Sequence, residues 1–192
     1  MDGHIEVERK RRLPDEDDGS FVARMLTGLG WQPDAPVTEV DTYYSRPDVD
    51  YMQTVECLRV RRRGDFCEIT YKPPSAEATH SSDGVISKKE TNVLLAFDQA
   101  QQADQLLENI GMRRLVQVKK HRAAYRHPKH PSVSVNIDTV AGVGVFVETE
   151  VISADPETAS DTVATIERRL GVADLPTVEL PYRDLAMGCT TS

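Results

Sequence analysis

The chain lacks any long hydrophobic run. Hydrophobic residues make up 39% of its 192 residues and charged residues 28%. The uninterrupted apolar segments are only a few residues long, which is too short to span a bilayer. The N-terminus also lacks the apolar core of a signal peptide, because six of the seven residues 6–12 are charged. We therefore expect a cytoplasmic protein with no membrane partner.

Cysteine is scarce, and no tract is dominated by glycine, proline or glutamine. Cys57, Cys67 and Cys189 show no metal-binding spacing and are odd in number, so we interpret them as reduced thiols rather than as a disulfide framework. No linker-like composition divides the chain. Its length suits one domain with its own core, and we expect a single domain over residues 1–192.

Positive charge is in deficit overall. The chain has 31 acidic and 23 Lys and Arg residues, a net charge of −8, which argues against general nucleic-acid binding. The basic residues are nevertheless bunched at 59–63 and 119–122. Two interpretations stay open for these clusters: they form solvated faces, or they enclose a small anion.

Several segments alternate apolar and polar residues, which predicts β-strands. These segments are 5–10, 58–63, 67–72, 87–93, 133–137 and 145–151. Gly64-Asp65 predicts a hairpin turn, and Gly142 and Gly144 predict another reversal. The Pro- and Ser-rich segment 73–84 is expected to be a long surface loop, and 127–131 an exposed turn because two of its residues are prolines.

Three segments have helical spacing instead. They lie at residues 21–29, from Asp98 to 110, and at 156–170. We expect Asp98 to cap the second helix, and Asp155 followed by Pro156 to begin the third, which Gly171 ends. Trp31 follows the first helix and is expected in the core.

Each predicted strand has one apolar and one charged face. In the first strand Glu6, Glu8 and Lys10 lie opposite Ile5 and Val7. An open sheet with its polar face in water shows this pattern, and so does a barrel with helices outside and a polar, ligand-filled interior. The charged faces are almost entirely ionisable. Carboxylates suit hard cations, and Arg and Lys suit phosphate oxygens, which favours the barrel.

Together these residues resemble the CYTH superfamily, also called triphosphate tunnel metalloenzymes. The resemblance begins with Glu6-x-Glu8-x-Lys10 and covers residues 6–184. The further motifs, in the order of the family, are Asp41-Thr42-Tyr43-Tyr44, Leu58-Arg59-Val60-Arg61, Thr70-Tyr71-Lys72, Lys120-x-Arg122, Asp138 and Glu148-x-Glu150.

The resemblance implies an α+β fold: a closed eight-stranded antiparallel barrel with helices packed outside. It implies one or two divalent metals, Mg²⁺ or Mn²⁺. The expected metal ligands are Glu6, Glu8, Glu90, Asp138, Glu148 and Glu150. The expected substrate-binding residues are Lys10, Arg59, Arg61, Lys72, Lys88, Lys120 and Arg122. The expected catalytic residues are Glu6, Glu8, Lys10, Lys72 and Lys120.

One strand departs from the family pattern. The family has an Arg followed by alternating Glu residues where this chain has Ser87-Lys88-Lys89-Glu90-Thr91-Asn92. Lys88 would replace that Arg, and a lysine acts as a point charge where an arginine offers a bidentate fork. Only Glu90 remains of the acids, which puts a second metal in doubt.

Two enzymatic activities fit this set of residues. A class IV adenylate cyclase converts ATP to cyclic AMP and pyrophosphate, whereas a triphosphatase releases phosphate from thiamine triphosphate or tripolyphosphate. The motif style favours the cyclase slightly. A non-catalytic nucleotide or polyphosphate receptor is the third alternative. The four carboxylates argue against it, because without a metal they would not contribute to the binding of an anion. The family permits homodimers.

Overall fold

The computed structural model describes residues 5–74, 86–88 and 90–188, apart from the side chains of Ile5 and of 86–88. The chain forms two compact units. The first comprises Met1–Pro36, Glu77–Lys88 and His121–Glu179, and the second comprises Val37–Ala76, Lys89–Lys120 and Leu180–Ser192. Most of the segment expected to be a loop, 73–84, lies outside the described residues. No helix among the described residues is long and apolar enough to cross a membrane.

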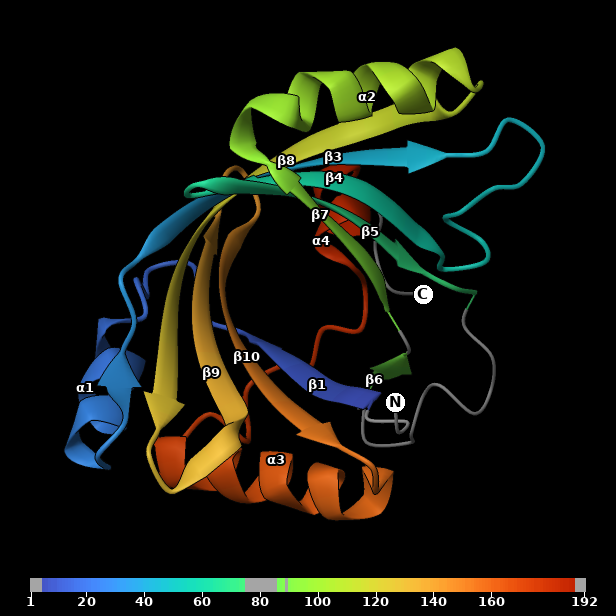
Figure 1. The fold of residues 1–192 in the computed structure, drawn as a ribbon. Coiled ribbons are helices and arrows are strands. Elements are labelled where there is room, and N and C mark those ends of the chain that lie inside the picture. The colour runs from blue at the N-terminus through green and yellow to red at the C-terminus, as the bar shows by residue number, and fades with distance from the viewer. Residues whose placement is uncertain (1–4, 75–85, 89, 189–192) are drawn as a thin grey trace. The chain divides into compact units, whose positions relative to one another are not determined.

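An antiparallel sheet forms the first unit (Figure 1). Its strand order is β6-β1-β10-β9-β8, and β2 pairs with β8. The strands are β1 (Ile5–Arg12), β2 (Gln32–Pro33), β6 (Ile86–Lys88), β8 (Arg113–His127), β9 (His130–Val140) and β10 (Gly144–Ser153). The helices are α1 (Ser20–Gly28) and α3 (Pro156–Leu170). Strand β8 continues along the chain from the second unit into the first.

Helix α3 packs on β1 and β10. Asp155 accepts a hydrogen bond from the Glu157 backbone at its start, Pro156 is its first residue, and Gly171 ends it with φ 73°, as predicted. Its buried residues, among them Val163 and Leu170, join Val7 and Val147 in one apolar core. The side chains of Glu6 and Glu8 therefore lie on the opposite face of β1, because successive strand residues alternate.

The same helix also buries charge. Glu167 has no exposed surface. It accepts hydrogen bonds from Arg9 Nε at 3.0 Å and from Arg11 Nη2 at 2.8 Å. Arg9 and Arg11 share the face of Val7 on β1, so this face combines an apolar core with one buried ionic contact between strand and helix.

The second unit contains the rest of the strands and α2 (Figure 1). Its strand order is β8-β3-β4-β5-β7. The elements are β3 (Val37–Ser45), β4 (Cys57–Arg63), β5 (Phe66–Lys72), β7 (Thr91–Ala96), the 3-10 helix η2 (Phe97–Gln99), α2 (Ala100–Asn109) and α4 (Tyr182–Ala186). The predicted turn at Gly64-Asp65 joins β4 to β5, and Gly64 has φ 54°. Helix α2 packs its Ala103 and Leu107 against Tyr44 and Val60.

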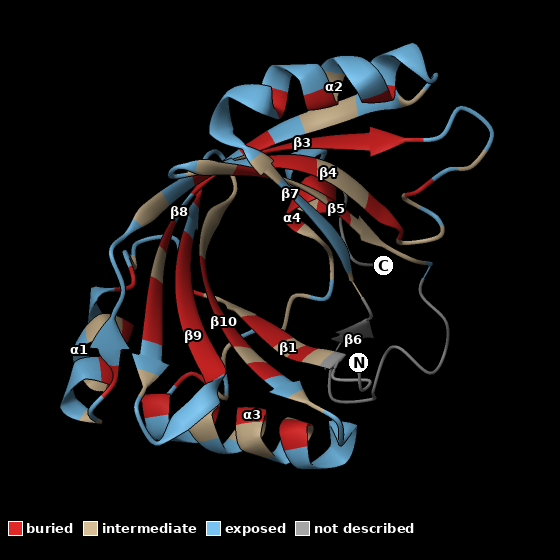
Figure 2. Ribbon diagram, in the orientation of Figure 1, coloured by how far each residue is buried: buried red, intermediate tan, exposed pale blue. Residues whose placement is uncertain are grey.

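Burial differs sharply between strands (Figure 2). Strand β9 is buried along most of its length, whereas five of the six residues of β7 are exposed. Cys57 and Cys67 are buried free thiols, as expected, and Cys189 lies outside the described residues. Trp31 is buried in the core of the first unit.

Three predictions need correction. The described residues form ten strands rather than eight: nine follow one another in the sheet, and β2 pairs with β8 outside that order. No ladder among the described residues joins the two end strands, β6 and β7, so the closed eight-stranded barrel is not observed. The strand expected at 87–93 is two strands, β6 and β7. Asp98 lies within η2, and α2 begins at Ala100 without a side-chain cap.

Candidate metal and phosphate sites

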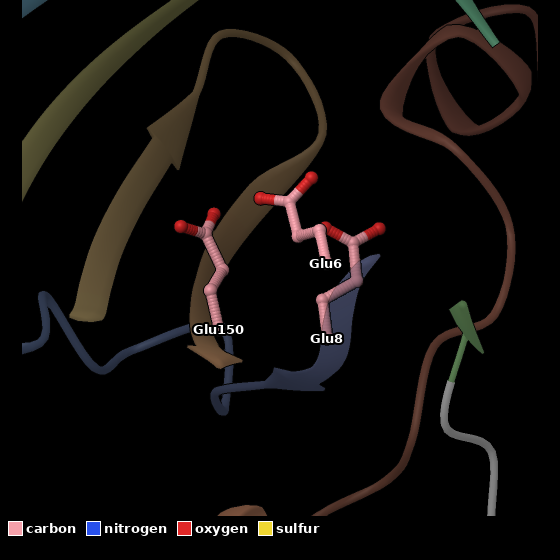
Figure 3. A group of neighbouring side chains, drawn as sticks. All are labelled: Glu6, Glu8 and Glu150. Atoms are coloured by element: carbon pink, nitrogen blue, oxygen red, sulfur yellow. The ribbon is translucent and has the colours of Figure 1, made fainter. Parts of the chain in front are cut away.

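Three carboxylates converge on the face of the first unit's sheet that α3 does not cover. Glu6 and Glu8 lie on β1 and Glu150 on β10, where Glu150 is paired directly with Glu8. Each offers an oxygen within 4.8 Å of the others, and all three are half-buried. Figure 3 shows the three side chains rising from the two neighbouring strands toward one another. We call them the acidic cluster.

The donor chemistry of the acidic cluster fits a hard divalent cation. Three carboxylates at this separation repel one another, and a cation bound between them removes that cost. Oxygen ligands are the ones that Mg²⁺ and Mn²⁺ prefer, and Mg²⁺ in particular is commonly held by a few carboxylates together with substrate phosphates. Glu6, Glu8 and Glu150 are therefore the residues that would hold such an ion.

Arg122 organises the carboxylates beside this cluster. From β8 its guanidinium donates to both carboxylate oxygens of Asp138 on β9, at 2.7 and 2.6 Å. It also contacts Glu148 and donates to Glu150 at 3.3 Å. Burial alone lowers the pKa of Arg122, but Asp138, Glu148 and Glu150 outweigh it and raise that pKa above its ordinary value. Arg122 therefore stays charged and fixes the orientation of Glu150.

Ser134 supports the same carboxylate from the other side. Its hydroxyl donates to Glu150 at 2.8 Å, and the two residues are paired across β9 and β10. Glu150 thus has one oxygen held by Arg122 and the other by Ser134. A carboxylate restrained at both oxygens is preorganised for binding, because little side-chain freedom remains to be lost.

A second charged network lies in the second unit. Arg61 donates to both oxygens of Asp41 at 2.7 Å, and its guanidinium lies 3.1 Å from Glu39. Lys120 lies 3.1 Å and Arg63 3.4 Å from Glu39. We call these residues and Arg59, 3.9 Å from Asp41, the basic network. It has four cations and two carboxylates, a net charge of +2.

Arg59 has donor capacity left within this network. Its Nε is buried and has no hydrogen-bond partner within the described part of the chain. Burial lowers the pKa of Arg59, but Asp41 together with Tyr43, Cys57 and Glu90 outweighs it, and the pKa is raised overall. A buried cation with an unsatisfied donor favours an anionic ligand.

The structure brings together three of the six expected metal ligands, Glu6, Glu8 and Glu150. Asp138 and Glu148 face Arg122 instead, and Glu90 lies in the second unit, paired with Lys72. Lys10 is buried on β1 opposite Glu148. Lys88 pairs through its backbone with Glu6, and its side chain lies outside the described residues.

Glu39 is the residue that the sequence analysis missed. It has no exposed surface and contacts three of the basic side chains. The signal was present, since Glu39 and Asp41 alternate on one strand. The ladder places these two residues opposite Arg63 and Arg61. Acids directly opposite bases on neighbouring strands pair readily.

Nearly the whole chain matches one known protein family. The family model of the CYTH domain matches residues 4–179. The chain belongs to the CYTH family. This confirms the resemblance seen in the motifs, and the match covers most of both units.

Three relatives illustrate the relationship. A Methanocaldococcus jannaschii protein named as a candidate adenylate cyclase is 28% identical over 146 residues, 76% of each chain. A Pyrococcus horikoshii structure has a TM-score of 0.77 at 23% identity, covering 95% of this CYTH chain and 98% of the other. A Hippeastrum structure has a TM-score of 0.70 at 16% identity, covering 97% of both; that protein is described as a candidate adenylyl cyclase with a dominant triphosphatase activity. The two structures support the fold alone.

Proposed function

We propose that this protein is a metal-dependent enzyme that cleaves a triphosphate. The observation that carries the proposal is the acidic cluster, because three carboxylates with oxygens within 4.8 Å of one another offer the oxygen ligands that a hard divalent cation prefers. Membership of the CYTH family supports it. The metal, when bound, supplies positive charge to the phosphate oxygens.

The chain's own residues would bind and orient the substrate. Arg59 and Arg61 would contact phosphate oxygens, since the guanidinium fork matches their geometry. Lys120 would add a point charge; it lies 5.2 Å from the ring centroid of Tyr182, which limits its movement. The other residues proposed to bind substrate are Lys72, which is held by Glu90, and Lys10, Lys88 and Arg122. Preorganised cations stabilise the charge that develops on the leaving phosphate.

The first candidate reaction is cyclisation of ATP. The ribose 3′-oxygen would attack the α-phosphorus and lose its proton, and the bond from the α-phosphorus to the bridging oxygen of pyrophosphate would break. The curated relative at 28% identity, named as a candidate adenylate cyclase, favours this reaction.

The second candidate reaction is hydrolysis, in which water attacks the γ-phosphorus and loses a proton. The bond from the γ-phosphorus to the β,γ-bridging oxygen breaks, and orthophosphate and the remaining diphosphate product are released. Two observations favour it. The side chains of the acidic cluster suit a metal and those of the basic network suit phosphate groups. Neither group of residues requires a nucleoside in the substrate. The Hippeastrum protein is also described as having a dominant triphosphatase activity.

Product analysis separates these alternatives. The protein is incubated with ATP, thiamine triphosphate or tripolyphosphate in the presence of Mg²⁺ or Mn²⁺. Cyclic AMP with pyrophosphate identifies the cyclase, and orthophosphate identifies the triphosphatase. Tight ATP binding without either product would overturn the proposal in favour of a receptor.

A matched pair of variants tests the role of the acidic cluster. Glu150→Gln keeps the size of the side chain but removes a ligand charge. We expect activity at limiting Mg²⁺ to fall by about 10- to 100-fold, the loss that residues around a metal typically produce. Glu16→Gln, an exposed acid outside the cluster, is expected to retain full activity. Equal activity of both variants would contradict the assignment.

A further inference from the structure

A cavity of about 580 Å³ lies in the first unit, between α3 and the turn that joins β8 to β9. Its volume is in the range of sites for small molecules. Four turns of α3 contribute side chains to one wall. Because α3 covers the Val7 face of β1, the sheet separates this cavity from the acidic cluster, whose carboxylates leave the strands on the other face. It is therefore a separate candidate site.

The floor of the cavity is apolar. Leu29, Trp31, Ile166 and Leu170 contribute to it, and Trp31 and Leu170 belong to the buried core of the unit. The Trp31 ring makes an edge-to-face contact with His127, with centroids 5.4 Å apart, so both rings are held in place. Such a floor favours a flat apolar group, since aromatic rings pack well edge to face.

The rim is cationic. Lys129 and Arg169 line it together with His127 and His130, against the carboxylate of Asp161. With neutral histidines these groups sum to a local charge of +1, in a chain whose net charge is −8. The arginine offers paired donors to an anion, and the lysine a mobile point charge.

The imidazole of His127 is oriented by the backbone. Its Nδ1 accepts a hydrogen bond from the Lys129 backbone N–H at 3.1 Å, so the neutral ring has its hydrogen on Nε2. The His130 ring lies 5.0 Å away, centroid to centroid. A cationic rim above an apolar floor selects a ligand with one apolar and one charged end.

We propose that this cavity binds a small molecule with one planar aromatic ring and one anionic group, an aryl phosphate or an aromatic carboxylate. The ring lies on the Trp31 floor, and the anion contacts Arg169 and Lys129. Neither the acidic cluster nor the basic network takes part, so this proposal stands apart from the proposed function.

Trp31 is the one tryptophan of the chain, which makes its fluorescence a direct reporter of the cavity. The protein is titrated with phenyl phosphate and with benzoate. Inorganic phosphate provides the anion without the ring, and benzyl alcohol the ring without the anion. We expect a saturable change with phenyl phosphate or benzoate that neither control reproduces. The tighter of the two binders identifies the anionic group.

Variants decide where the ligand binds. Arg169→Gln is expected to weaken binding by about tenfold or more, the loss expected for a charge-assisted hydrogen bond. Arg24→Gln, at an exposed arginine of α1 that does not line the cavity, and Arg59→Gln in the basic network are expected to bind as the unmodified protein does. No saturable change, or equal weakening by Arg169→Gln and Arg24→Gln, would overturn the proposal.

Discussion

Glu39 holds the basic network together. Its carboxylate is fully buried and contacts Arg61, Arg63 and Lys120. It draws three cations to one point and so limits the positions that their side chains can take. We propose Glu39 as a positioning residue for the cations that bind phosphate.

Glu39→Gln tests this role, because it preserves shape and removes charge. Breaking a buried ionic contact leaves its partners uncompensated, so we expect a loss of about 3–5 kcal/mol in the free energy of unfolding. We also expect KM for the triphosphate to change, with partial recovery in Glu39→Asp. Urea denaturation and steady-state kinetics measure the two effects. Lower stability with unchanged KM would leave Glu39 a purely structural role.

Asp41 confers a pH dependence on stability. Burial raises the pKa of its carboxyl, but Arg61 and Arg59 outweigh burial and hold the pKa well below the ordinary value. A carboxyl whose pKa is lower in the folded than in the unfolded state stabilises the fold at pH values above its pKa in the unfolded state, about 3.9. This contribution to stability is lost as the pH falls below that value. The difference in unfolding free energy between wild type and Asp41→Asn should therefore be constant at neutral pH. It should shrink below about pH 4. Urea titrations at several pH values check this, and a difference that grows on acidification would refute it.

At the scale of elements, the contact of α3 with β1 combines packing and charge. Glu167 lies among apolar residues and is held by Arg9 and Arg11. Glu167→Ala leaves two cations facing an apolar core, so we expect a loss of about 3–5 kcal/mol in unfolding free energy. Glu157→Ala, at an exposed position of the same helix, should cost little. Thermal and urea unfolding compare the two variants, and equal destabilisation would rule out a special role for the buried contact.

At the scale of the whole molecule, the proposed function predicts that each unit contributes to activity, the first through the acidic cluster and the second through the basic network. We expect Glu150→Gln and Arg59→Gln each to lower kcat/KM for the triphosphate by about tenfold or more, because each removes a charge that the proposal assigns to metal or phosphate binding. Steady-state kinetics measures both variants, with Glu16→Gln, at an exposed acid of the first unit, as the control. Unchanged kcat/KM in either variant would contradict the role proposed for its unit.

The amino-acid sequence by itself determined much of the local structure. The period-two pattern placed Glu6 and Glu8 on one face and Val7 on the other, and the structure keeps that division. Asp155, Pro156 and Gly171 marked the ends of α3 correctly, because capping depends on neighbouring residues alone. Strand β2 escaped prediction because two residues are too few to show a period, and β6, with three residues, was not separated from β7 for the same reason.

Only the tertiary structure decided which charges meet. By the alternation of the sequence, Glu148 and Glu150 lie on the same face of their strand and cannot be told apart. The register of the ladder pairs Glu150 with Glu8 and Glu148 with Lys10. The position of Arg122 on β8 draws Glu148 and Asp138 toward its guanidinium. Pairing of this kind depends on contacts between residues distant in the chain, such as Arg9 with Glu167. Periodicity fixes the face on which a side chain lies, whereas register and helix packing fix its partner.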